Sequence, residues 1–144
     1  MRALGIDYGE RRIGLALSDA TGLLASPWKT LVNDANLDRA ASRIAAELAA
    51  LDGDSDRVDV IVIGLPRRLN GDPTDQTARV RSLSALLGAR TALPIVLQDE
   101  RLTSHEAESL LAMREPDWRK RKGRLDQMAA ALILQDYLDH QRSR

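Results

Sequence analysis

A short run of β-branched residues near the middle of the chain constrains the fold most. Residues 58–64 read Val-Asp-Val-Ile-Val-Ile-Gly and are nearly continuous in apolar side chains. Such a run is typical of a parallel strand covered on both faces, because a strand with one wet face alternates apolar and polar residues. Parallel strands need crossover connections, which are usually helices. The run therefore predicts an α/β protein with this strand near the centre of its sheet.

The flanking segments complete the predicted sheet. Residues 3–8 and 12–18 predict a hairpin, and residues 23–31 predict a third strand that Pro27 confines to an edge or to the strand's start. Apolar periodicity predicts a helix over 37–51 capped by Asn36, and a second helix ending near Gly88. The sequence then predicts a strand over 94–98 and a helix over 106–113, which a capping box of Thr103 and Glu106 opens. It also predicts a last helix from about Arg124 to His140.

This order predicts a mixed five-stranded sheet, an antiparallel meander followed by parallel strands, flanked by helices. At 144 residues the chain has the length of one domain, over residues 1–144. Residues 114–123 are the one linker-like stretch, and we expect them to form a flexible basic loop.

Composition excludes several function classes. The chain has no cysteine, which removes thiol catalysis, disulfide frameworks and cysteine metal sites. It carries no phosphate-binding P-loop, dinucleotide fingerprint or serine nucleophile elbow. Its apolar runs, such as residues 60–63, are far shorter than the about 18 residues of a membrane span, and no signal peptide precedes the first strand. We expect a soluble, cytoplasmic protein without a membrane partner.

Acidic residues occupy unusual positions. Asp7 lies inside an apolar strand and shares a face with Ala3, Gly5 and Gly9, which leave room for an ion or a phosphate. Its alternative role is to cap the turn at Gly9.

Further acidic residues lie at the end of a strand and on the last helix. Asp99 and Glu100 lie at the carboxyl end of a strand, where open α/β sheets bind ligands. Their alternative role is that of ordinary acidic loop residues before a helix, whose N-terminus favours negative charge. Because neighbouring residues of a strand face opposite ways, only one of the two would enter a site. Asp126 borders the apolar stripe of the last helix, where a surface role at the helix start is the alternative. Together with Asp7, these carboxylates resemble the oxygen ligands of one or two hard divalent cations.

The formal net charge is zero, with 21 cationic and 21 anionic side chains, so any nucleic-acid contact depends on local clusters. Residues 114–124 hold six cationic and two anionic residues. Basic residues here and near the predicted turns are candidates for phosphate contact, with solvated surface charge as the alternative for each. They are Arg11, Arg12, Arg67, Arg68, Arg119, Lys120, Arg121, Lys122 and Arg124.

Four segments in chain order carry a family resemblance. They are Gly-Ile-Asp-Tyr-Gly through Gly-Leu-Ala-Leu-Ser-Asp at 5–19, Gly-Leu-Pro with Asn-Gly at 64–71, Asp-Glu-Arg-Leu-Thr-Ser at 99–104, and Lys-Gly-Arg-Leu-Asp with Ala-Ala-Ala-Leu-Ile-Leu at 122–134. Together they span almost the whole chain and closely resemble the YqgF/RuvX family. The resemblance implies an RNase H-like fold, relatedness to Holliday junction resolvases, and a nuclease that matures the 5′ end of the small-subunit (16S) ribosomal RNA precursor.

By position, the resemblance assigns the family's catalytic acidic residues to Asp7, Glu100 and Asp126, with Asp99 as the alternative to Glu100. These residues would hold Mg²⁺ or Mn²⁺ and hydrolyse a phosphodiester bond. The implied partners are precursor ribosomal RNA, the small-subunit precursor, and branched or single-stranded DNA, for a monomer or homodimer. Two rival functions remain: resolution of four-way DNA junctions, and a non-catalytic module that binds RNA or the ribosome.

Overall fold

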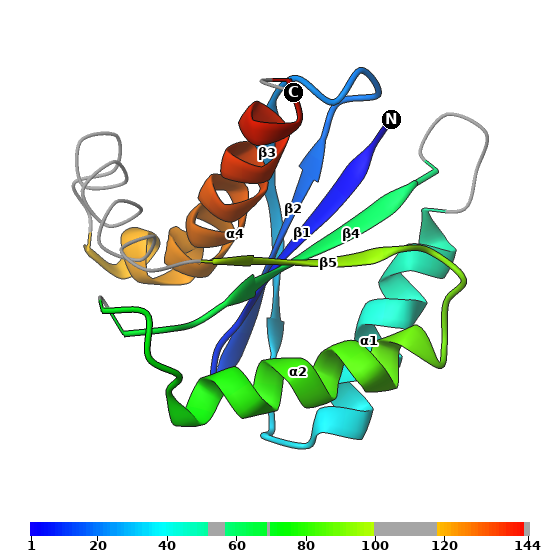
Figure 1. The fold of residues 1–144 in the computed structure, drawn as a ribbon. Helices are drawn as coiled ribbons and strands as arrows, with labels where there is room; N and C mark the ends of the chain where they lie inside the picture. The colour runs from blue at the N-terminus through cyan, green and yellow to red at the C-terminus, as the bar shows by residue number, and fades with distance from the viewer. Residues whose placement is uncertain (52–56, 69, 100–117, 143–144) are drawn as a thin grey trace.

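The computed structural model describes residues 1–51, 57–68, 70–99 and 118–142, with side chains of the last range from residue 124 onward. Five strands form one sheet in the order β3-β2-β1-β4-β5 (Figure 1). The strands are β1 (Ala3–Tyr8), β2 (Arg12–Ser18), β3 (Ala25–Val32), β4 (Val60–Leu65) and β5 (Ile95–Asp99). Strand β2 is antiparallel to both β1 and β3, whereas β4 is parallel to both β1 and β5. The predicted mixed sheet is confirmed.

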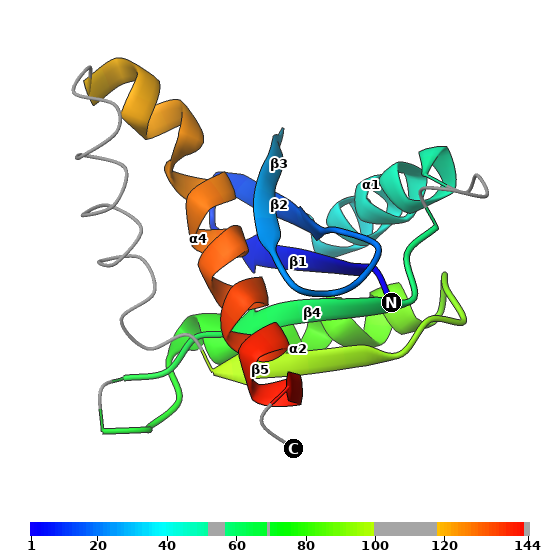
Figure 2. The same cartoon turned by 90° about the horizontal axis from the view of Figure 1, so that it is seen from above.

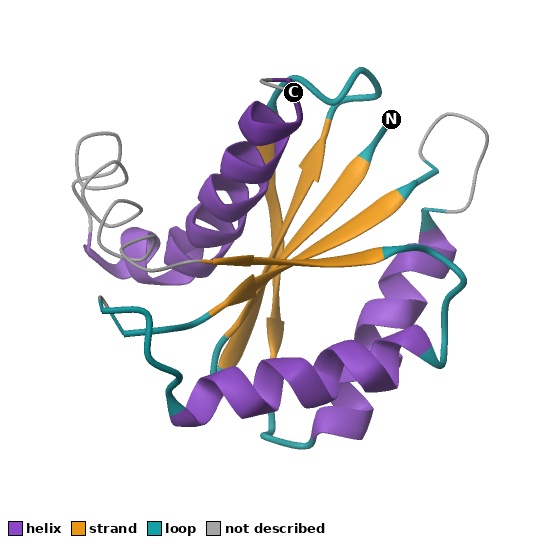
Figure 3. Cartoon of the chain, viewed as in Figure 1, coloured by secondary structure: helices purple, strands orange, loops and turns teal. Residues whose placement is uncertain are grey.

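The described helices cover both faces of this sheet (Figures 2 and 3). They are α1 (Leu37–Ala50), α2 (Asp75–Gly88) and α4 (Trp118–Arg142). Helices α1 and α2 pack on one face, against a core that includes Leu4, Ile6 and Ile63. Helix α4 packs on the other face, against a core that includes Ala3 and Val62. All six residues of β4 are buried, as its continuous apolar sequence predicts.

Local signals mark the ends of several elements. The Asn36 side chain accepts a hydrogen bond from the backbone N–H of Arg39 at 3.0 Å and so caps α1 as predicted. Strand β3 lies at the sheet edge, where Pro27 is tolerated, and its register with β2 shifts between Leu15 and Ala16. The predicted helix over 106–113 lies outside the described residues. No described helix has the length and apolarity that a membrane crossing requires.

The last helix begins earlier than predicted. It begins at Trp118, so residues 118–123 are helical and the expected loop over that part is wrong. Arginine and lysine are good helix formers, and a single glycine at 123 does not end a helix whose later turns are buried against the sheet. Asp126 therefore lies about two turns inside α4 rather than in its first turn. Its position needs an explanation other than compensation of the helix dipole.

Candidate active site

Asp7 lies on the face of the sheet that α4 covers. It is half-buried, and the residues two and four positions before it, Gly5 and Ala3, share its face. In the β1–β2 hairpin Asp7 lies directly opposite Gly14. Directly opposite residues of antiparallel strands present their side chains to the same face. The Asp7 carboxylate therefore shares its side of the sheet with Gly14.

Gly14 is also the place where α4 meets the sheet. A Cβ atom at Gly14 would lie 1.9 Å from the carbonyl oxygen of Asp126 and 2.9 Å from the backbone nitrogen of Gln127. Only glycine permits so close an approach of the two backbones. One residue, Gly14, thus lies next to both Asp7 and Asp126. The fold brings two of the predicted carboxylates, 119 positions apart in the sequence, to one place.

Arg12 forms an ion pair with Asp126. Its Nε donates a hydrogen bond to Asp126 Oδ2 at 2.9 Å, and the two side chains are 40% and 22% exposed. Arg12 is two residues from Gly14 on β2, so both face α4. Arg12, which is predicted to bind phosphate, and Asp126, which is predicted to bind a cation, are therefore bonded to each other.

Asn33 is a buried polar residue that supports the β1–β2 turn. Its Nδ2 donates to the carbonyl oxygen of Gly9 at 2.7 Å, and its backbone N–H donates to the carbonyl oxygen of Arg11 at 2.8 Å. It thereby holds the turn that carries Arg11 and precedes Arg12. Asn33 is not among the residues that the sequence predicts for the site. Its polar side chain after a strand was a weak signal, which the nearby helix cap at Asn36 obscured.

Asp99 does not join the site on Asp7's face of the sheet. It pairs with Leu65, which belongs to the core under α1 and α2. The preceding residue, Gln98, points the other way and donates a hydrogen bond to Asp136 of α4 at 2.8 Å. Strand alternation thus directs Asp99 away from the face that holds Asp7. Glu100, its alternative, lies outside the described residues.

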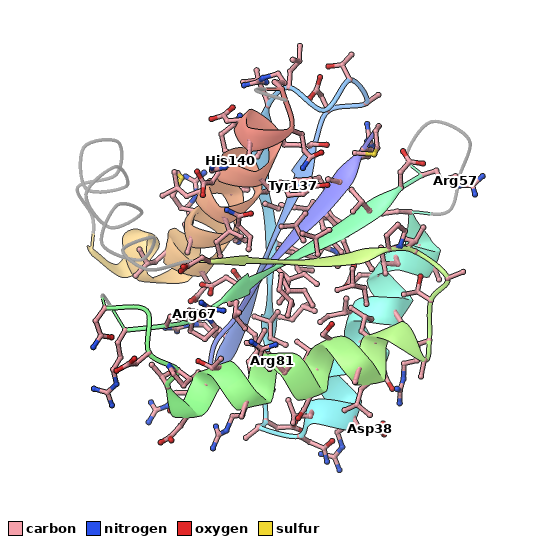
Figure 4. All side chains as sticks on the ribbon, in the orientation of Figure 1. Asp38, Arg57, Arg67, Arg81, Tyr137 and His140 are labelled. Carbon is pink, nitrogen blue, oxygen red and sulfur yellow. The ribbon has the colours of Figure 1, made fainter. Side chains whose placement is uncertain are left out.

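The described basic candidates lie on the surface. Arg11 is exposed on the turn beside the site, and Arg124 is exposed on α4, two residues before Asp126. Arg67 and Arg68 are exposed just after β4, and Figure 4 shows Arg67 at the edge of the sheet where β5 also ends. Arg119, Lys120, Arg121 and Lys122 belong to the first turns of α4, but their side chains lie outside the description.

The chemistry of the site suits a hard divalent cation. Carboxylate oxygens are the ligands that Mg²⁺ and Mn²⁺ prefer. At Gly14 the backbones of β2 and α4 approach so closely that any side chain there would collide with α4, which holds Asp126 next to the strand that pairs with Asp7. Within the described residues no group of three or more histidine, cysteine, aspartate or glutamate side chains converges. The described part of the site thus supplies two carboxylates, and the third predicted ligand, Glu100, falls outside it.

Residues 1–140 match the model of a family described as "RuvX: Holliday junction resolvase". The chain belongs to the RuvX family. Among relatives of this RuvX chain, a protein of Syntrophus aciditrophicus named as a pre-16S rRNA nuclease is 41% identical, over 96% of this chain and 89% of that protein. A protein of Bacillus subtilis with the same name is 36% identical, over 96% of this chain and 98% of that protein.

Solved structures show that this RuvX chain has the RNase H-like fold of RuvC-like resolvases. Thermus thermophilus RuvC in complex with a Holliday junction substrate matches with a TM-score of 0.60 at 13% identity, covering 99% of this chain and 96% of that one. The fowlpox virus resolvase in complex with Holliday junction DNA also matches with a TM-score of 0.60, at 9% identity, covering 98% of this chain and 99% of the other.

Proposed function

We propose that the chain is a divalent-cation-dependent nuclease that matures the 5′ end of pre-16S ribosomal RNA in the cytoplasm, as one domain over residues 1–144. The observation that carries the proposal is the placement of Asp7 and Asp126 next to Gly14: Asp7 lies directly opposite it on β1, and the backbone of Asp126 packs against it. The relatives named as pre-16S rRNA nucleases, at 33–43% identity, support the RNA as substrate.

In this proposal Asp7, Asp126 and Glu100 hold Mg²⁺ or Mn²⁺. Such a cation, when bound, makes water a stronger nucleophile and offsets the charge that develops on the phosphate. The chain holds the carboxylates in position. Gly14 contributes to this because it lets the backbone of α4, which carries Asp126, pack directly on β2. Arg11 and Arg12, on and beside the β1–β2 turn, hold the phosphates of the strand, and the basic turns of α4 extend this contact.

Resolution of four-way DNA junctions is the second candidate. The family description and the RuvC complex with a Holliday junction favour it. Cutting a two-fold symmetric junction at both positions needs a symmetric dimer. Trimming of an RNA end has no such requirement, so a monomer satisfies the RNA proposal.

Cleavage of two matched substrates separates these functions. We would incubate the protein with a 5′ segment of the 16S rRNA precursor and with a four-way DNA junction, in Mg²⁺, in Mn²⁺ and in EDTA. The proposal expects cleavage of the RNA only when a cation is present. Cleavage of the junction alone, by a dimeric protein, would favour the resolvase instead.

Two variants test whether the site does the cutting. Asp7→Asn removes the central carboxylate, and we expect it to abolish cleavage while the protein stays folded. Asp136→Asn is the matched control because Asp136 is exposed on the same helix, about 15 Å along it from Asp126. A protein that binds the RNA tightly but cuts neither substrate would be a non-catalytic binding module.

A further inference from the structure

We propose that Arg12 is a positioning residue that couples cation binding to nucleic-acid binding at the proposed site. In the free protein its guanidinium neutralises Asp126 and lowers the affinity for the cation. When nucleic acid binds, the guanidinium turns to a phosphate and leaves the carboxylate to the cation. This inference rests on the proposed nuclease function and concerns how the same site is loaded.

The geometry of the ion pair leaves Arg12 with donors through which a phosphate can draw it away from Asp126. The contact with Asp126 Oδ2 uses Nε, at 2.9 Å. A guanidinium has five N–H donors, so its two terminal nitrogens remain able to form the forked contact that suits a phosphate. The side chain is 40% exposed, which gives a phosphate access to it.

The backbone at Arg12 is held in place, so any change is confined to the side chain. The carbonyl oxygen of Arg12 accepts a hydrogen bond from the backbone N–H of Gly9 at 2.9 Å. Asn33 holds the same turn through Gly9 and Arg11. Asp126 is equally fixed, because its backbone is packed on Gly14. A rotation of the Arg12 side chain is therefore enough to exchange one partner for the other.

Electrostatics makes the two partners of Asp126 competitors. A guanidinium and a divalent cation on one carboxylate repel each other, so each weakens the other's binding. A phosphate that attracts the guanidinium removes this repulsion. By thermodynamic linkage, nucleic acid then tightens cation binding by the same factor by which the cation tightens nucleic-acid binding.

The first test measures cation affinity without nucleic acid. Free Mn²⁺ is titrated by electron paramagnetic resonance against the intact protein, Arg12→Gln and Arg142→Gln. Because partly exposed ion pairs are weak, we expect Arg12→Gln to bind Mn²⁺ about two- to fivefold more tightly. Arg142→Gln removes an ion pair with Asp139 about 24 Å along α4 from Asp126, beyond the screening length of about 10 Å at 0.1 M salt, and leaves the Mn²⁺ affinity unchanged.

The second test measures the coupling itself. The affinity for the precursor RNA segment is measured by fluorescence anisotropy in EDTA and in Ca²⁺, which takes the same oxygen ligands. We expect Ca²⁺ to tighten RNA binding by the unmodified protein more than by Arg12→Gln. Equal tightening in both proteins, or a weaker Mn²⁺ affinity in Arg12→Gln, would overturn the role of Arg12. If instead Asp7→Asn binds Mn²⁺ as the unmodified protein does, the proposed cation site itself fails.

Discussion

Gly14 of β2 lies directly against the backbone of Asp126: a Cβ atom on the glycine would fall 1.9 Å from the aspartate's carbonyl oxygen. This contact sets the height of α4 above the sheet at the point where Asp7 lies on the neighbouring strand. The position of α4 over Asp7 thus depends on residue 14 having no side chain. Fold and proposed chemistry are linked at this residue.

Gly14→Ala should therefore damage both stability and activity. The added methyl group has no room, so α4 or β2 must move, and overpacking of this kind costs about 1–3 kcal/mol. Gly88→Ala is the matched control, because its Cβ would make an ordinary contact at 3.8 Å with Ile95 and alanine is the better helix former. Urea unfolding should show a large loss for the first variant and none for the second. Equal stabilities would mean that the close approach at Gly14 is not a constraint.

Asn33→Ala should weaken the turn that carries the basic residues. It leaves the carbonyl oxygen of Gly9 without the hydrogen bond from Nδ2, and loss of one such partly buried bond costs about 0.5–1.5 kcal/mol. RNA affinity should fall as well, because Arg11 and Arg12 lose their fixed positions. Asn70→Ala, at an exposed residue whose side chain bonds only to Asp72, should change stability by less than about 0.5 kcal/mol. An Asn33→Ala protein with normal stability and RNA affinity would contradict this role.

Asp19 gives the protein a pH-dependent component of stability. The backbone N–H of Leu24 and the hydroxyl of Thr21 donate to its carboxylate and hold the pKa of Asp19 well below its ordinary value of 3.8. A pKa that is lower in the folded state adds stability above the unfolded-state pKa, and this is lost as the pH falls toward the folded-state value. Asp19→Asn should thus be less stable at pH 7, with a difference that shrinks below pH 3.8. Urea midpoints from pH 7 to about pH 2.5 test this prediction, and a constant difference would contradict it.

Neutralising the start of α4 should weaken nucleic-acid binding in a salt-dependent way. A triple variant with glutamine at Arg119, Lys120 and Arg121 removes up to three phosphate contacts. Each lost contact should lower the slope of log affinity against log salt by about 0.7–0.9. RNA binding measured from about 50 to 200 mM salt gives the slope. An unchanged slope would remove this part of α4 from the binding surface.

The secondary structure follows largely from local signals. The β-branched run ending at Gly64, the turn after Tyr8 and the cap at Asn36 each predict their element from neighbouring residues, and the structure confirms them. The start of the last helix is the exception. A basic segment with one glycine resembles a loop. The helix extends back to Trp118 because arginine and lysine are good helix formers and the later turns of α4 are buried against the sheet.

The site is less accessible to sequence reasoning because its contacts are long-range. Asp7 stands out in the sequence as a charge inside an apolar strand. Nothing local indicates that Gly14 would seat α4, that Arg12 would pair with Asp126, or that Asn33 would support the turn. Each of these depends on how distant segments pack. The choice between Asp99 and Glu100 likewise needs the strand register, which directs Asp99 to the face opposite Asp7.

A crystal structure with Mn²⁺ would show whether Asp7 and Asp126 share one cation. Anomalous diffraction locates Mn²⁺ without assumptions about its ligands. We expect a peak within about 2.5 Å of oxygens from both carboxylates, and loss of that peak in Asp7→Asn crystals grown in the same way. Manganese bound elsewhere on the chain, with neither carboxylate in contact with it, would rule out a cation site shared by Asp7 and Asp126.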